Sequence, residues 1–181
     1  MSESIFKENL FEGKKVFITG GATGMGLGFA KAFLEHGADV LIASRKEENL
    51  SKAASEIKEQ TGKTLHWKMM DVRNNETVEE VAKYIKDKWG YLDVLVNNAA
   101  GNFVTPAAAM SENAWRAVID IVLDGTFRVS KACYPLLRNN EEGSSIVNII
   151  ANYAWGAAPF VAHSGAAKAG VLNLTRSLAL E

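Results

Sequence analysis

Residues 15–28, KVFITGGATGMGLG, have the pattern of a short buried strand, a glycine-rich turn and the start of a helix. Glycines let the backbone turn sharply and come close to a ligand, and the free N–H groups at the start of a helix favour a phosphate. An ordinary tight turn could use the same glycines. Here an apolar strand precedes them and an apolar helical pattern follows, which is the context that a dinucleotide-binding turn requires. We therefore expect a dinucleotide to contact Gly20, Thr23, Gly24, Met25 and Gly26.

Apolar strand-like runs alternate with helical patterns along the rest of the chain. Strands are expected near residues 15–19, 39–43, 64–69, 93–97 and 145–150, and helices near 25–36, 47–60, 75–89, 112–138 and 162–180. This alternation predicts an α/β fold, a doubly wound parallel sheet of the Rossmann type with helices on both faces. In the strand order 3-2-1-4-5, ligands bind at the carboxyl ends of the first and fourth strands.

No linker or repeat divides residues 1–181, so we expect a single dinucleotide-binding domain. A six-stranded sheet of this kind needs one more strand than the chain supplies. The expected fold is therefore C-terminally incomplete, without its last strand and the segment that would cover the substrate.

The charge balance and the rare residue types exclude several classes of function. With 20 basic and 21 acidic residues the net charge is -1, which gives no general attraction to nucleic acid or to a membrane surface. No apolar run reaches the length of a membrane span, and residues 1–10 lack a signal core, so we expect a cytoplasmic protein. Cys133 is the only cysteine and the three histidines lack ligand spacing, so no metal site is expected.

The second expected strand ends in Ser44, Arg45 and Lys46, where the adenosine ribose of a bound dinucleotide would lie. An acidic residue there would accept the ribose hydroxyls of NAD, whereas these side chains offer charge-assisted hydrogen bonds to a 2′-phosphate. A solvated basic loop at the start of a helix is the alternative. The residue types favour NADP(H) as the cofactor.

A second motif, NNAAG at residues 97–101, follows the fourth expected strand. Local capping by its asparagines would explain this turn alone. Together with TGGATGMG at residues 19–26, however, it resembles the paired signatures of the short-chain dehydrogenase/reductase family. The resemblance implies that Asp71 and Val72 flank the adenine. It also implies that the second turn lies along the cofactor through Asn98, Ala99, Ala100 and Gly101.

The usual catalytic residues of that family are only partly present. The family has a tyrosine four residues before a lysine, whereas here Ser164 stands four residues before Lys168, and Val122 stands at the position of the family's asparagine. Tyr153 instead follows the last expected strand, fifteen residues before Lys168. With the sequence NAAGNF at residues 98–103, this arrangement resembles the 2,4-dienoyl-CoA reductase branch of the family, and the resemblance covers nearly the whole chain.

That branch implies NADPH-dependent reduction of a conjugated 2,4-dienoyl-CoA thioester in the breakdown of unsaturated fatty acids. Reduction places negative charge on the thioester oxygen, and aimed hydrogen-bond donors stabilise such a charge. Tyr153 and Asn102 are the expected donors. Lys168 would hold the cofactor ribose and add positive potential, and Ser164 would point into the same pocket. Simpler interpretations are that Tyr153 is an aromatic lid and that Asn102 is a turn residue.

Two other functions stay open from the sequence. One is a general NADP-dependent carbonyl reductase of the same family, in which Tyr153 donates a proton. The other is a non-catalytic, nucleotide-binding relative. NADPH consumption with a dienoyl thioester and with a simple ketone would separate these possibilities.

The helix expected over residues 162–180 bears on assembly. Small residues (Ala162, Ala166, Ala167 and Gly170) are expected on one side of it, and longer apolar ones (Val171, Leu174 and Leu178) on another. One side would pack on the sheet. The family resemblance implies that the other side meets a second copy, so we expect a homodimer or homotetramer. A monomer is the alternative.

Overall fold

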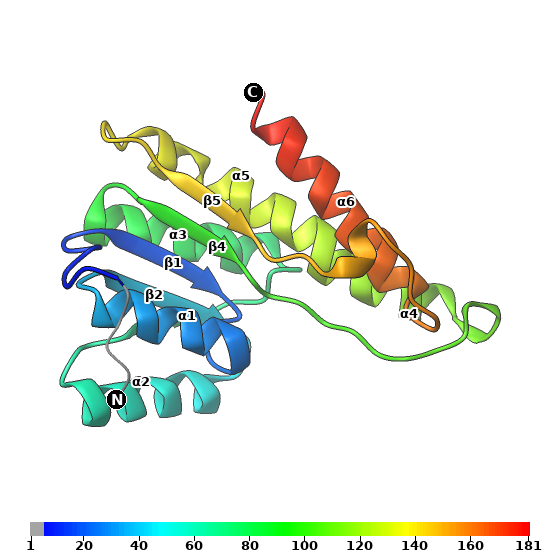
Figure 1. The fold of residues 1–181 in the computed structure, drawn as a ribbon, viewed down its shortest axis with the longest axis horizontal. Helices are drawn as coiled ribbons and strands as arrows, with labels where there is room; N and C mark the ends of the chain where they lie inside the picture. The colour runs from blue at the N-terminus through cyan, green and yellow to red at the C-terminus, as the bar shows by residue number, and fades with distance from the viewer. Residues whose placement is uncertain (1–5) are drawn as a thin grey trace.

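The computed structural model describes residues 6–181, and its centre is a five-stranded parallel sheet (Figure 1). The strands are β1 (Lys15–Thr19), β2 (Asp39–Ser44), β3 (His66–Met69), β4 (Val94–Asn97) and β5 (Ser145–Asn148). Their order, β3-β2-β1-β4-β5 with all neighbours parallel, confirms the predicted doubly wound arrangement. The carboxyl ends of β1 and β4 therefore lie side by side at the centre of one edge.

Helices cover both faces of this sheet. They are α1 (Gly24–Glu35), α2 (Glu47–Thr61), α3 (Asn75–Trp89), α4 (Glu112–Ile119), α5 (Gly125–Arg138) and α6 (Ala162–Leu178). Successive side chains of a strand point to opposite faces. In β1, Phe17 joins an apolar core with α3 and α5, whereas Val16 and Ile18 join another with α1 and α2. α4, the start of α6 and residues 98–111 extend beyond the carboxyl ends of the strands (Figure 1).

The first turns of the helices differ in a way that bears on ligand binding. α3 begins with a side-chain cap, because Asn74 Oδ1 accepts hydrogen bonds from the backbone N–H groups of Glu76 at 2.9 Å and Thr77 at 3.4 Å. α1 has no such cap, since the side chain of Thr23 accepts no hydrogen bond there, and no acidic residue lies in its first turn. The N–H groups at the start of α1 are therefore left to a ligand or to solvent.

The predicted helix over residues 112–138 is interrupted. A π-helical segment, Asp120–Asp124, separates α4 from α5. Thr126 Oγ1 donates a hydrogen bond to the Val122 carbonyl oxygen at 2.7 Å, and the Val122 side chain is buried. The sequence pattern could not reveal this segment, because a single π-helical turn shifts the apolar pattern of a long helix too little to be recognised. Such segments occur often at functional sites.

The predicted division of α6 into two faces is wrong at Ala167. Its side chain is fully buried and packs in one apolar cluster with Val171, Val118 and Val122. Ala162 and Ala166 are exposed. The side of α6 that packs on the rest of the protein therefore combines small and longer residues, because the π-helical segment comes close to it.

Cys133 and the membrane expectation can also be compared with the structure. Cys133 is 1 % exposed, and burial raises the pKa of its thiol to about 12, which makes a reactive thiolate unfavourable. Within residues 6–181, no helix is both long enough and apolar enough to cross a membrane. Residues 1–5, part of the segment expected to lack a signal core, lie outside the described residues.

Candidate functional site

Some of the glycines in the turn between β1 and α1 leave no room for a side chain. Gly20 has a φ of +64°, in the left-handed region that favours glycine. A Cβ atom on Gly26 would lie 2.4 Å from the Gly20 carbonyl oxygen and 2.6 Å from Asn98 Nδ2. Both distances are shorter than any normal contact, so glycine is required at residue 26 by the approach of a second turn.

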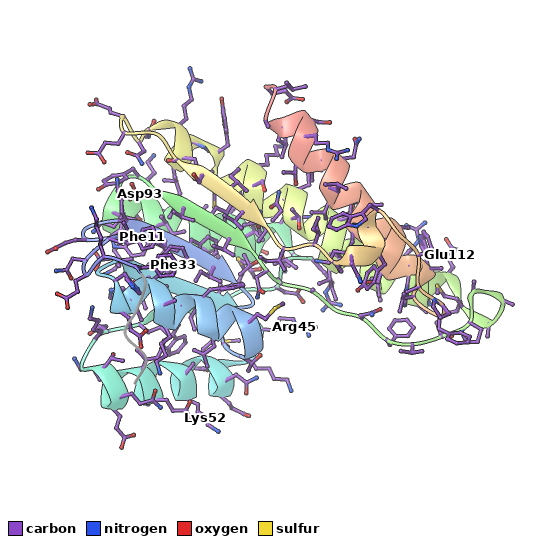
Figure 2. All side chains as sticks on the ribbon, viewed as in Figure 1. Phe11, Phe33, Arg45, Lys52, Asp93 and Glu112 are labelled. Atoms are coloured by element: carbon purple, nitrogen blue, oxygen red, sulfur yellow. The ribbon has the colours of Figure 1, made fainter. Side chains whose placement is uncertain are left out.

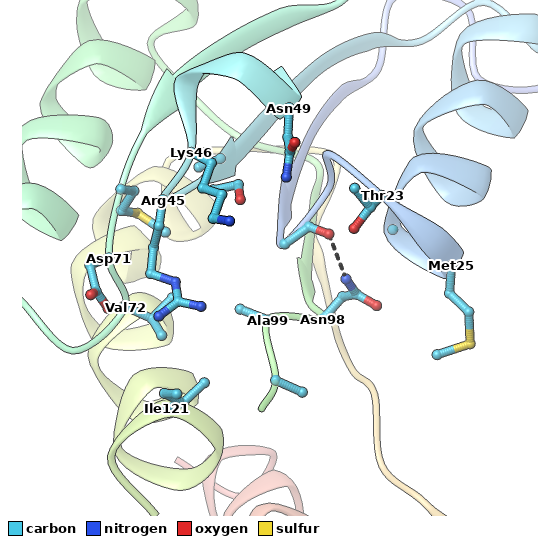
Figure 3. Close-up of a pocket in the computed structure, with 16 residues that line it drawn as sticks. Thr23, Met25, Arg45, Lys46, Asn49, Asp71, Val72, Asn98, Ala99 and Ile121 are labelled. Carbon is cyan, nitrogen blue, oxygen red and sulfur yellow. Dashed lines mark hydrogen bonds between the residues drawn. The ribbon is translucent and has the colours of Figure 1, made fainter. Parts of the chain in front are cut away.

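That second turn follows β4 and is tied to the first by hydrogen bonds. Asn98 Nδ2 donates to the carbonyl oxygens of Thr19 at 3.0 Å and Gly20 at 3.1 Å, the latter drawn in Figure 3. Thr19 Oγ1 accepts from the backbone N–H groups of Asn98 and Ala99, each at 3.0 Å. The Asn98 side chain therefore joins two turns, and the alternative of local capping does not describe it.

Between these turns and the end of β2 lies a cavity of about 340 Å³ (Figure 3). The predicted cofactor contacts that line it are Gly20, Thr23, Met25, Gly26, Ser44, Arg45, Lys46, Asp71, Val72, Asn98, Ala99 and Ala100. Three predicted contacts, Gly24, Gly101 and Lys168, do not line it. Four unpredicted residues do: Ala43, Asn49, Met70 and Ile121. Of these four residues, Asn49 has the polar side chain. Its position in the first turn of α2 is the sequence feature that could have predicted its place at the cavity.

Arg45 and Lys46 place positive charge on one side of this cavity. Both side chains are exposed and directly follow β2. Arg45 lies at the carboxyl end of the sheet and Asp93 at the opposite end (Figure 2). Among the described residues, Arg45 has no ion pair and donates no hydrogen bond.

Asp71 contributes a carboxylate to the same cavity, and that carboxylate is already paired. Arg73 Nε donates to its two oxygens at 3.0 and 3.1 Å, and Arg73 Nη2 donates to Oδ2 at 2.6 Å. These hydrogen bonds hold the pKa of Asp71 below its usual value. The positive charge of Arg45 acts in the same direction, to a smaller extent.

A second group of polar side chains lies where α6 begins. The Tyr153 hydroxyl lies 3.2 Å from Ser164 Oγ, which joins the 3₁₀ turn Asn152–Ala154 after β5 to the first turn of α6. Lys168 is one helical turn further along, and its Nζ donates to the Ile149 carbonyl oxygen at 2.5 Å. Lys168 is 8 % exposed, and this burial lowers the pKa of its ammonium group. The structure thus brings three of the four predicted catalytic residues into one region.

Asn102, the fourth, lies exposed on the segment after β4 and forms no hydrogen bond within residues 6–181. Two contacts of its neighbours hold this segment near α6. The Phe103 ring meets the His163 ring edge-on, with centroids 4.5 Å apart, and the Thr105 N–H donates to the Phe160 carbonyl oxygen at 3.0 Å. Phe160 itself has a φ of +65°, which is uncommon for a residue other than glycine.

His163 is a further residue of this site, for which the sequence predicts no function. The structure buries it completely, with its Nδ1 accepting a hydrogen bond from the Ser164 N–H at 2.9 Å. Its helical neighbours gave no signal of this burial, because the contact comes from Phe103, some sixty residues earlier in the chain.

Comparison with known proteins identifies the family. The short chain dehydrogenase family matches residues 14–181. The chain therefore belongs to this family, and the resemblance noted from the sequence is confirmed. A crystal structure of a short chain dehydrogenase from Bacillus anthracis has 46% sequence identity and a TM-score of 0.85, over 92% of this chain and 69% of that one.

Curated relatives carry a more specific name. A Bacillus subtilis protein named probable 2,4-dienoyl-CoA reductase is 45% identical over 170 residues, which are 94% of this chain and 66% of that protein. A zebrafish (Danio rerio) protein named peroxisomal 2,4-dienoyl-CoA reductase is 39% identical over 177 residues, which are 98% of this chain and 59% of that protein. The chain thus spans less than two thirds of the length of these relatives.

Proposed function

We propose that this protein is an oxidoreductase that uses NADPH to reduce a conjugated 2,4-dienoyl-CoA thioester. The observation that carries the proposal is the position of Tyr153, whose hydroxyl lies 3.2 Å from Ser164 although it comes from the loop after β5. A tyrosine thus reaches the start of α6 without occupying the usual position four residues before Lys168. The names of the curated relatives support the same substrate class.

The cavity at the glycine turn fits a dinucleotide phosphate. The uncapped start of α1 offers N–H groups, and Gly24, the first residue of α1, has no atom within 4 Å of where a side chain would begin. Arg45 and Lys46 supply positive charge where the adenosine ribose would lie, and Ser44 adds a hydroxyl. These residues favour a cofactor that carries a 2′-phosphate.

When bound, NADPH supplies the hydride for this reaction. The protein's own task is then to stabilise the negative charge that develops on the thioester oxygen. In our proposal Tyr153 and Asn102 donate hydrogen bonds to that oxygen. Ser164 orients the Tyr153 hydroxyl, and Lys168 adds positive potential from the next turn of α6 while binding the cofactor ribose.

The Tyr153→Phe substitution tests the proposed donor. It should lower kcat for a dienoyl thioester by about 10²–10³, the usual loss for one donor to an oxyanion, while leaving NADPH affinity nearly unchanged. Tyr134→Phe is a matched control, because Tyr134 is exposed on α5 and lines no part of the cavity. Full turnover in the Tyr153→Phe protein would show that this tyrosine is only a wall of the site.

A further inference from the structure

The cavity contains a carboxylate on its expected adenine side, within reach of the charge of the arginine that would hold a 2′-phosphate. Asp71 and Arg45 both line it, and the labelled side chains lie next to each other in the close-up (Figure 3). A carboxylate in this place has two unfavourable effects. It repels a 2′-phosphate, and it competes with that phosphate for the Arg45 guanidinium.

Arg73 reduces both the repulsion of a phosphate by Asp71 and the competition for Arg45. Its guanidinium binds both oxygens of Asp71 in a forked contact, with three N–O distances between 2.6 and 3.1 Å, and its backbone N–H donates to Asp71 Oδ1 at 3.0 Å. Arg73 does not line the cavity. It therefore satisfies the carboxylate without occupying the space of a ligand.

The other charged groups near this pair are few. Asp120, in the π-helical segment, lies close enough to Arg73 to stabilise its positive charge. Arg128 Nη1 donates to the carbonyl oxygens of Val72, at 3.1 Å, and Asp120, at 3.4 Å, rather than to Asp71. Among the described residues, Arg73 is thus the one cation in an ion pair with Asp71.

We propose that Arg73 is a specificity-determining positioning residue: by holding the Asp71 carboxylate it leaves Arg45 available to a 2′-phosphate. This inference rests on the proposed use of NADPH. A cofactor without the 2′-phosphate gains little from the arrangement, because its ribose offers no charged group to Arg45. The readout is therefore the ratio of NADPH affinity to NADH affinity, rather than either affinity alone.

Removing the Arg73 charge should allow the Asp71 carboxylate to repel a 2′-phosphate and to compete for Arg45. In Arg73→Gln, the Asp71 carboxylate is released and pairs with Arg45, and the local charge falls by one. We expect NADPH affinity to fall about tenfold while NADH affinity changes by less than about twofold, as for the loss of one charge-assisted contact. In the Asp71→Asn/Arg73→Gln double variant the competing carboxylate is gone, so the NADPH preference should return.

Calorimetric titration of the whole protein with NADPH and with NADH measures these ratios directly. Arg116→Gln is a matched control, because it removes an exposed arginine from an ion pair with Glu112 on α4, outside the cavity. An equal loss for both cofactors in Arg73→Gln would mean that Arg73 only supports the cavity wall. Failure of the double variant to recover the preference would overturn the proposed competition.

Two outcomes distinguish failure of the Arg73 proposal from failure of the NADPH assignment. If the unmodified protein prefers NADPH and Arg73→Gln keeps that preference, the inference is wrong and the cofactor assignment stands. If the unmodified protein binds both cofactors equally, the assignment falls and the inference with it. Should Arg73→Gln fail to fold, Asp71→Asn alone decides, because a reduced NADPH preference in that variant would contradict the account.

Discussion

Gly26 and Gly28 stand two residues apart in α1 but have different surroundings. A Cβ atom on Gly26 would collide with the Gly20 carbonyl oxygen and with Asn98, whereas one on Gly28 would meet no atom within 4 Å. We therefore expect Gly26→Ala to cost about 1–3 kcal/mol of stability and to abolish NADPH binding. Gly28→Ala should instead stabilise the protein by about 0.5–1 kcal/mol, because alanine favours the helix, and leave binding unchanged.

Denaturant unfolding together with NADPH titration of both variants checks this difference. Equal effects of the two substitutions would mean that residue 26 does not need to be glycine for the contact between the glycine turn and Asn98. The comparison is well matched, since both changes add one methyl group to the same helix.

Among single residues, the sequence predicts best those whose role depends on neighbours in the chain. The glycine turn, the basic residues after β2 and the Asn98 turn were all predicted from local patterns, and they line one cavity. His163 was missed because its ring contact comes from Phe103, far away in the chain. Arg73 was missed although its partner Asp71 is only two residues away, because the spacing alone does not show that the two side chains turn toward each other. Lys168 does not line this cavity and donates to the Ile149 carbonyl oxygen, so its contact with the cofactor ribose stays a prediction.

The junction of the π-helical segment with α5 depends on one close contact between elements. Gly125 begins α5, and a Cβ atom there would lie 2.8 Å from Val72 Cγ2 and 3.0 Å from Val72 Cβ. Val72 also lines the cavity, so this contact connects helix packing to the side of the site where the adenine is expected. Apolar periodicity predicted that residues 112–138 are helical, but it could not predict this approach.

Gly125→Ala should therefore destabilise the protein by about 1–3 kcal/mol through overpacking. Val72→Ala removes Cγ2, the nearer of the two close atoms, and leaves Cβ, so the double variant should be more stable than the sum of the single effects predicts. A double-mutant cycle measured by denaturant unfolding gives this coupling. Strictly additive changes in the free energy of unfolding would show that the side chains at residues 72 and 125 do not interact.

Assembly is a property of the whole molecule that the exposed side of α6 allows us to test. Ala162, Ala166 and Ala169 are exposed along this helix, and small side chains permit another helix to approach closely. We expect the protein to form a homodimer or homotetramer in which α6 takes part. Ala166→Glu should then shift the protein to a smaller species in sedimentation velocity.

Ser51→Glu on the exposed side of α2 is the control for an added charge, and it should leave the assembly unchanged. A protein that sediments as a monomer before any substitution would contradict this prediction. An oligomer that persists in Ala166→Glu would place the contact on another surface.

In the function proposed above, the cofactor cavity and the Tyr153 group together reduce a conjugated dienoyl thioester. The most direct measurement follows NADPH oxidation with a 2,4-dienoyl-CoA, a monoenoyl-CoA and a simple ketone in parallel, under identical conditions. We predict turnover with the dienoyl thioester, and little or none with the other two, because the proposed site aims the hydride at the far carbon of the dienoyl group, which a monoenoyl thioester and a ketone lack, while Tyr153 is proposed to stabilise the charge on the oxygen. Faster NADPH oxidation with the ketone than with the dienoyl-CoA would contradict the account and point to a general carbonyl reductase.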